Sequence, residues 1–342
     1  MIVRHLSVCK GGQILGRWSK SWKTVPLQGN QTRRNCSSLD QTRNEERKYE
    51  EVRIPVPWGH IAGKWWGPKN KQPVLAMHGW LDNANSFDPL MKLMPSNFSL
   101  LSLDLPGHGL SSHYPAGIPH HLTEDIVSLR RIIKHFGWQK VSFLCHSMGS
   151  TYAFIYSAIY PKEVNKLVGL DILRPFEMTA EFYAKNGGNY IDKYIETIQN
   201  TREPPESTLE DFAKRQHEGS KKSISVESSR ILMERGAYQS KSKPGLIGLR
   251  RDVRLKVTFL HNLPHEYLIE LASRIRCEVY NIKAKGGMYY EKKSHYKQTI
   301  EVLKKVAKAM QYFEVDGTHH THLNTPENVV DIVKDIFCDD IA

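Results

Sequence analysis

A series of short apolar runs, separated by turn formers and by segments of helical pattern, is the feature that most constrains the fold. Most of these runs are continuous rather than alternating, which is typical of strands buried on both faces of a parallel sheet. The first two are β-type runs broken by Pro57, Gly59 and Gly67. The expected strands are 52–56, 60–66, 74–77, 100–103, 141–144, 167–170, 279–282 and 312–315.

Helical patterns separate these strands. The clearest follows Thr123, a candidate N-cap, and its apolar stripe consists of Leu122, Ile126, Leu129, Ile133 and Phe136. Alternation of strand and helix predicts a parallel sheet with right-handed crossovers, helices on both faces, and a ligand site beyond the carboxyl ends of the strands.

Residues 175–274 interrupt this alternation, because they are long, polar and mostly helical in pattern. We interpret them as an inserted cap on a core formed by residues 50–174 and 275–342. Residues 1–49 are expected to be a basic leader. Seven Lys or Arg and no Asp or Glu lie between Met1 and Leu39, a composition that fits either a mitochondrial presequence or a disordered leader that stays in the cytosol.

The net charge of +12 therefore does not by itself predict a nucleic-acid partner, since more than half of it lies in the leader. No apolar run is long enough for a membrane span. The five cysteines are widely separated and form no C-x-x-C pair, which favours a reduced intracellular protein.

The central chemical signal is the run from Val141 to Ser150, in which an apolar strand enters a tight turn at Ser147 and then an apolar helix. This is a nucleophile elbow, where small neighbours let strand and helix approach and expose the serine hydroxyl. Cys145 replaces the first glycine of the G-x-S-x-G pattern, a small change because cysteine packs as a small hydrophobe. The alternative is a buried structural serine.

A serine needs a base to accept its proton, and His319 lies in the loop after the last expected strand, where the chain order Ser, acid, His places the base. Its neighbours His320 and His322 raise the alternative of zinc. No helical H-E-x-x-H or cysteine pair supports a metal, so we predict no metal and no cofactor.

Backbone amides that follow two strands are expected to form an oxyanion hole. Met148 directly follows the nucleophile, and Trp80 follows His78-Gly79 at the end of an early strand. The segment Asp104 to Gly109 is interpreted as a structural turn.

The acid of the triad is less clearly marked, because the loop after the penultimate strand, residues 284–288, contains no carboxylate. Glu291 lies farther along, and Asp171 ends the strand before the cap. We take Asp171 as the candidate. The residues alone leave open whether it orients His319 or only bonds to nearby loop amides.

Together these segments resemble the α/β-hydrolase superfamily, and more closely the serine hydrolase-like (kraken-like) proteins, over residues 50–338. The most telling segments are 57–64, 78–83, 104–109, 146–149 and 315–320. The resemblance implies a mostly parallel eight-stranded sheet, Ser147 as nucleophile, His319 as base, a cap after Pro175 and no cofactor. An acid after the earlier strand resembles the arrangement in pancreatic-type lipases. Relatives of this group have been linked to peroxisomes or vesicles, but the terminal residues 340–342 do not match S-K-L.

The sequence therefore predicts a serine hydrolase that cleaves a small, partly apolar carboxylic ester or thioester. Two alternatives remain: a degenerate hydrolase that binds a ligand or partner, and an acyltransferase that uses the same triad. Neither nucleic acid nor an integral membrane segment is an expected partner, and the oligomeric state is left open.

Overall fold

The computed structural model describes residues 47–200, 204–257 and 263–341. Residues 1–46, and with them nearly all of the predicted leader and its presequence, lie outside the described residues. Among the helices of the described residues, none has the length and apolar character that crossing a membrane requires.

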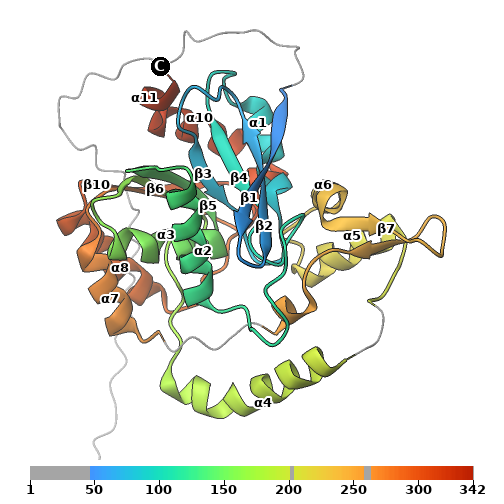
Figure 1. Ribbon diagram of the computed structural model, residues 1–342. Coiled ribbons are helices and arrows are strands. Elements are labelled where there is room, and N and C mark those ends of the chain that lie inside the picture. The colour runs from blue at the N-terminus through green and yellow to red at the C-terminus, as the bar shows by residue number, and fades with distance from the viewer. Residues whose placement is uncertain (1–46, 201–203, 258–262, 342) are drawn as a thin grey trace, which may run out of the picture. The chain divides into compact units, whose positions relative to one another are not determined.

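The central element is an eight-stranded sheet with the order β1-β2-β4-β3-β5-β6-β9-β10 (Figure 1). Strands β1 and β2, and β2 and β4, pair antiparallel, and all later neighbours pair parallel. Its strands are β1 (Tyr49–Val56), β2 (Gly59–Trp66), β3 (Val74–Met77), β4 (Leu100–Leu103), β5 (Val141–His146), β6 (Val164–Leu170), β9 (Glu278–Ala284) and β10 (Ala309–Val315). The mostly parallel sheet predicted from the apolar runs is confirmed.

The helices of the core alternate with these strands along the chain. They are α1 (Asp88–Leu93), α2 (Leu122–His135), α3 (Met148–Ile159), α8 (Lys293–Val306), α9 (Thr321–Asn324), α10 (Glu327–Ile336) and α11 (Cys338–Ile341), with the 3-10 turn η2 (Ala84–Phe87) before α1. Helix α2 follows the predicted stripe, but its N-cap is His121, whose ring accepts a hydrogen bond from the Thr123 amide. The prediction that Thr123 is the N-cap was wrong, because Thr123 lies within the first turn of α2.

Successive residues of the central strands enter two separate apolar layers. Met77 and Cys145 pack on the face covered by α2, α3 and α8, whereas Ala76 and Leu144 pack on the face covered by α1 and α10. Because side chains alternate across a strand, both positions must be apolar when helices cover both faces. This double burial explains why the strands read as continuous apolar runs.

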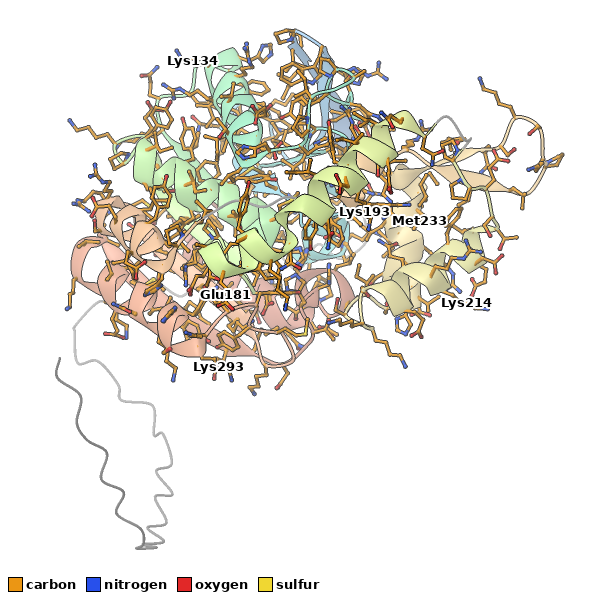
Figure 2. All side chains as sticks on the ribbon, turned by 90° about the horizontal axis from the view of Figure 1, so that it is seen from below. Lys134, Glu181, Lys193, Lys214, Met233 and Lys293 are labelled. Atoms are coloured by element: carbon orange, nitrogen blue, oxygen red, sulfur yellow. The ribbon has the colours of Figure 1, made fainter. Side chains whose placement is uncertain are left out.

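The chain between β6 and β9 is mostly helical in its described part, and its role as a cap stays a prediction. Its elements are α4 (Ala180–Gln199), α5 (Leu209–Gly219), α6 (Val226–Gly236), β7 (Ala237–Gln239), β8 (Ile247–Leu249), η3 (Val253–Lys256) and α7 (His265–Arg274). In Figure 2, α4 crosses in front with Glu181 and Lys193, and Lys214 and Met233 mark α5 and α6 to one side.

The predicted end of the cap, residue 274, is the last residue of helix α7. Helix α7 contacts α3 and α8, and its Leu271 and Ala272 belong to the same apolar layer as Cys145. The pattern of α7 is that of any amphipathic helix, so the sequence could not show which surface it covers. We therefore propose that the cap ends before His265.

One buried arginine ties α6 to the core. Arg235 donates its Nε to Asp104 at 2.7 Å, and its two terminal nitrogens bond to the Glu51 carboxylate at 2.6 and 3.0 Å. Asp104 is fully buried and also accepts from the amides of Ala84 and Leu110, as a structural turn requires.

Replacing Arg235 with methionine is expected to lower the free energy of unfolding by about 3–5 kcal/mol, because it leaves Asp104 buried without its counter-charge. Urea denaturation measures the change. Arg230→Met is the matched control, since Arg230 is exposed and pairs with the equally exposed Glu210. A loss for Arg235→Met no larger than that of the control would contradict the role given to this ion pair.

Candidate active site

Ser147 lies at the turn between β5 and α3 with φ 49° and ψ −113°, a region that non-glycine residues rarely adopt. The start of α3 lies very close to the end of β3, because a Cβ on Gly149 would meet the carbonyl oxygen of Met77 at 2.3 Å. The Gly149 amide instead donates to the His78 carbonyl at 3.1 Å. Cys145, the departure from the glycine pattern, is fully buried in the core.

The backbone strain at Ser147 predicts a stability difference between two variants that both lack the hydroxyl. Ser147→Gly is expected to exceed Ser147→Ala by about 1 kcal/mol in free energy of unfolding, because glycine adopts a positive φ without strain. Chemical denaturation of the two variants tests this. An alanine variant as stable as the glycine variant would show that the turn is unstrained.

His319 lies in the loop between β10 and α9 and faces Ser147. Its Nε2 is 2.9 Å from Ser147 Oγ, and its Nδ1 bonds to Asp171 Oδ2. In the neutral tautomer that fits both partners, Nδ1–H donates to the carboxylate and Nε2 accepts from the serine hydroxyl. The structure thus brings together the three residues that the sequence singled out from distant positions.

Asp171 follows β6 and is fully buried. Its Oδ1 accepts from Lys283 Nζ at 2.7 Å and from the Ala284 amide at 3.1 Å, so it bonds both to a loop amide and to the histidine. Burial raises the pKa of Asp171, but the hydrogen bond and charge of His319, together with Lys283, outweigh burial and hold this pKa below its usual value. The carboxyl group is therefore ionised at neutral pH.

Gly287, in the loop after β9, lies directly against the Asp171 carboxylate. A Cβ at this position would meet Asp171 Oδ1 at 2.1 Å, so the space next to His319 is already filled by the acid from β6. Glu291, the other candidate acid, forms an ion pair with the buried Arg174 rather than with His319.

Trp80 and Met148 are the residues whose amides are predicted to form the oxyanion hole. Met148 is the first residue of α3, so its N–H has no acceptor within the helix. Within the described residues, the Trp80 amide donates no hydrogen bond, while its indole Nε1 donates to the Leu255 carbonyl at 2.8 Å. Both residues line the cavity that Ser147 and His319 also line.

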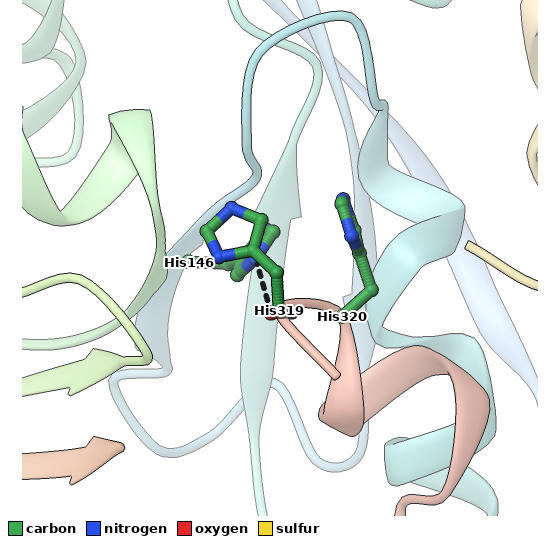
Figure 3. Close-up of side chains that lie close together, drawn as sticks. All are labelled: His146, His319 and His320. Atoms are coloured by element: carbon green, nitrogen blue, oxygen red, sulfur yellow. Dashed lines mark hydrogen bonds between the residues drawn. The ribbon is translucent and has the colours of Figure 1, made fainter. Parts of the chain in front are cut away.

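The imidazole rings of His319 and His320 both contact that of His146, and Figure 3 shows the three side chains together. His146 Nε2 lies 3.0 Å from the His319 carbonyl oxygen, and Asp82 Oδ2 lies 3.3 Å from His146 Nδ1 and 3.4 Å from His320 Nε2. Burial raises the pKa of Asp82, yet His320 and His146 outweigh burial and hold this pKa well below its usual range. Burial lowers the pKa of His146 to about 3, so this ring is neutral.

These imidazole nitrogens approach one another within 4.8 Å, close enough to share a metal ion. In the present arrangement, however, both ring nitrogens of His319 are taken by Asp171 and Ser147. The absence of a metal stays a prediction. His322 is buried beside His146, whereas His320 lines the cavity.

The cavity above Ser147 has a volume of about 770 Å³ and lies between the core and the insertion. Its wall is largely apolar, with residues such as Leu122, Phe182, Phe212 and Tyr290. A site of this size suits a small organic molecule.

Sequence reasoning missed Lys283, Asp82 and His146 as parts of the site. A lysine directly after the apolar run 279–282 was a usable signal, because a lysine in a buried strand must be paired. Asp82 and His146 gave no such signal, since both lie next to motifs that already had a role.

Comparison with known proteins gives matches over most of the chain. The family model described as the alpha/beta hydrolase fold matches residues 72–247. A Drosophila melanogaster protein named "Probable serine hydrolase" is 40% identical over 83% of this chain and 86% of its own length. "Serine hydrolase-like protein 2" of Homo sapiens is 33% identical over 83% of this chain and 92% of its own. The solved structure of a hypothetical protein from Pseudomonas aeruginosa PAO1 is 26% identical, with a TM-score of 0.74 over 84% of this chain and 99% of that chain.

Proposed function

Since this chain belongs to the α/β-hydrolase fold family, and within it to the serine hydrolase-like proteins, we propose that it hydrolyses a carboxylic ester or thioester through an acyl-enzyme on Ser147. The observation that carries this proposal is the continuous hydrogen-bond chain from Asp171 through His319 to Ser147, at the floor of a largely apolar cavity. Its members are neighbours in space and distant in sequence.

In the first half of the reaction, Ser147 Oγ attacks the carbonyl carbon while its proton passes to His319 Nε2. The carbonyl oxygen becomes negative and accepts hydrogen bonds from the Trp80 and Met148 amides. Asp171 stabilises the imidazolium that forms. The C–O or C–S bond to the leaving group then breaks as His319 returns the proton to the departing oxygen or sulfur.

In the second half, His319 removes a proton from water, and the resulting hydroxide attacks the acyl carbon. The bond between that carbon and Ser147 Oγ breaks, the serine regains its proton, and the carboxylic acid leaves. Cavity volume and lining favour a partly apolar acyl group.

The acyl-enzyme is tested by partitioning. An aryl ester, an alkyl ester and a thioester that share one acyl group are hydrolysed in the presence of methanol. We expect one common ratio of methyl ester to free acid, because all three pass through the same intermediate. A ratio that changes with the leaving group would contradict the proposal, and methyl ester without free acid would favour the acyltransferase.

The pH dependence of kcat/KM is expected to reflect the environment of His319. Burial lowers the pKa of this imidazole below its ordinary value of 6.5, and the hydrogen bond to Asp171 offsets only part of the change. The base acts when neutral, so kcat/KM should stay high at pH 6.5 and fall only at lower pH. A profile measured with a neutral ester tests this, and a half-maximal value above pH 6.5 would contradict it.

A further inference from the structure

The wall of the cavity carries more positive charge than negative. Four cationic side chains line it, and none of them forms an ion pair with a described acid; they are Arg215, Lys221, Arg251 and Lys256. The two acids that line the same cavity are already engaged. Asp82 lies between His146 and His320, and Asp125 accepts from the hydroxyls of Tyr114 and Tyr152 at 3.0 and 2.7 Å.

Arg251 and Lys256 flank a segment of the insertion that is held firmly on the core. The Asp252 amide donates to the Gly107 carbonyl at 2.8 Å, and the Leu255 carbonyl accepts from the indole of Trp80 at 2.8 Å. The same residue, Trp80, supplies the proposed oxyanion amide. The two cations therefore flank a segment that is hydrogen-bonded to the side chain of Trp80.

The acid nearest in sequence is not available to neutralise this pair. The Asp252 carboxylate bonds to the guanidinium of Arg254 at 2.6 Å and lies 3.2 Å from His120 Nε2. Arg254 in turn donates to the carbonyls of Pro115 and Ile118. Asp252 and Arg254 thus attach the segment to the core. Arg251 and Lys256 take no part in these hydrogen bonds.

Burial distinguishes Arg251 from an ordinary surface cation. Its Nε is buried and has no hydrogen-bond partner among the described residues, and burial lowers the pKa of the side chain. Burial also lowers the pKa of Lys256, and the positive charge of Arg251 lowers this pKa further. Both cations line the cavity without an ion-pair partner among the described residues, so they can pair with an anion that enters it.

We propose that Arg251 and Lys256 form an anion subsite of this cavity, so that the ester or thioester substrate carries a carboxylate or phosphate group besides its reacting carbonyl. The inference rests on the proposed function, because it names the substrate class of the same site. A guanidinium and an ammonium that line one cavity suit a terminal oxyanion, which can accept two or more charge-assisted hydrogen bonds. The anion binds and orients the substrate and takes no part in the bonds that break.

The test compares the rates at which matched fluorophosphonates modify Ser147. The probes share a short, medium or long alkyl chain that ends in a methyl group, a carboxylate or a phosphate monoester. For the wild type at the best chain length, we expect an anionic probe to react about ten- to a hundredfold faster than its methyl counterpart. The carboxylate and phosphate arms show which oxyanion fits.

In Arg251→Gln and Lys256→Gln, the ratio of anionic to methyl rates should fall towards one. Lys241→Gln removes the same charge from an exposed position of the insertion outside the cavity, and should keep the wild-type ratio. Lys256 is itself exposed, so its variant tests the subsite even if Arg251→Gln does not fold.

The outcomes separate the two proposals. If the wild type reacts equally fast with methyl and anionic probes at every length, the anion subsite is wrong and the serine hydrolase stands. If the ratio falls equally in Lys241→Gln, the effect is one of overall charge and the subsite is again wrong. If folded wild type reacts with no probe, the proposed function fails, and the inference fails with it.

Discussion

Replacing Ser147 with alanine is expected to lower kcat for ester hydrolysis by about 10⁶-fold while the protein stays folded. Among the described residues, the Ser147 hydroxyl is the group that bonds to His319 Nε2, at 2.9 Å, and in the proposed mechanism it attacks the carbonyl. Removing it leaves the amides of Trp80 and Met148, which in the proposed mechanism still bind and polarise an ester. The remaining rate should therefore exceed that of water alone.

Ser157→Ala is the matched control for this change. Ser157 also lies in α3 and is buried, but its hydroxyl donates to the Ala153 carbonyl in its own helix. We expect kcat within about twofold of wild type for this variant, since a local side-chain bond of this kind contributes little. Turnover by Ser147→Ala comparable to that of the control would show that another group is the nucleophile.

Replacing Asp171 with asparagine is expected to lower kcat by about 10⁴-fold, the second largest effect. The neutral amide cannot stabilise the imidazolium, and its NH₂ group favours the wrong tautomer of His319. The variant also leaves the Lys283 ammonium buried without its counter-charge, so a loss of stability should accompany the loss of rate. Kinetics with a short-chain ester, together with a denaturation curve, measure both.

Asp316→Asn provides the comparison, because Asp316 lies in the same loop as His319 but pairs with Lys285 at the surface. Its kcat should match that of wild type. Gly287→Ala is a further check that changes no polar group. Its added methyl group would clash with Asp171 Oδ1 and displace the carboxylate, so this variant should also have a lower kcat. An active Asp171→Asn enzyme would assign the carboxylate a structural role only.

The sheet could be predicted from the sequence because strands buried on both faces appear there as continuous apolar runs. Each of the eight expected apolar runs became a strand, although the bounds moved by a few residues. The packing of α7 could not be predicted, since its apolar face, which includes Leu271 and Ala272, would look the same on a cap or on a core.

That Ser147, His319 and Asp171 lie together could be predicted in part for a similar reason. Ser147 and His319 stand next to strands that the pattern reveals, so their meeting follows from the topology. Asp171 could only be a candidate, because its carboxylate fits beside His319 only where Gly287 has no side chain. Asp171 and Gly287 are 116 positions apart, and the sequence does not show that they are in contact. The Gly286-Gly287 pair was the available signal.

The most direct test of a nucleophilic Ser147 activated by His319 is intact-mass analysis after treatment with a simple alkyl fluorophosphonate. We predict that the wild type gains one adduct, that peptide mapping places it on Ser147, that Ser147→Ala gains none, and that His319→Ala reacts far more slowly. A folded wild type that gains no adduct, or a Ser147→Ala variant that gains one, would contradict a serine hydrolase built on Ser147.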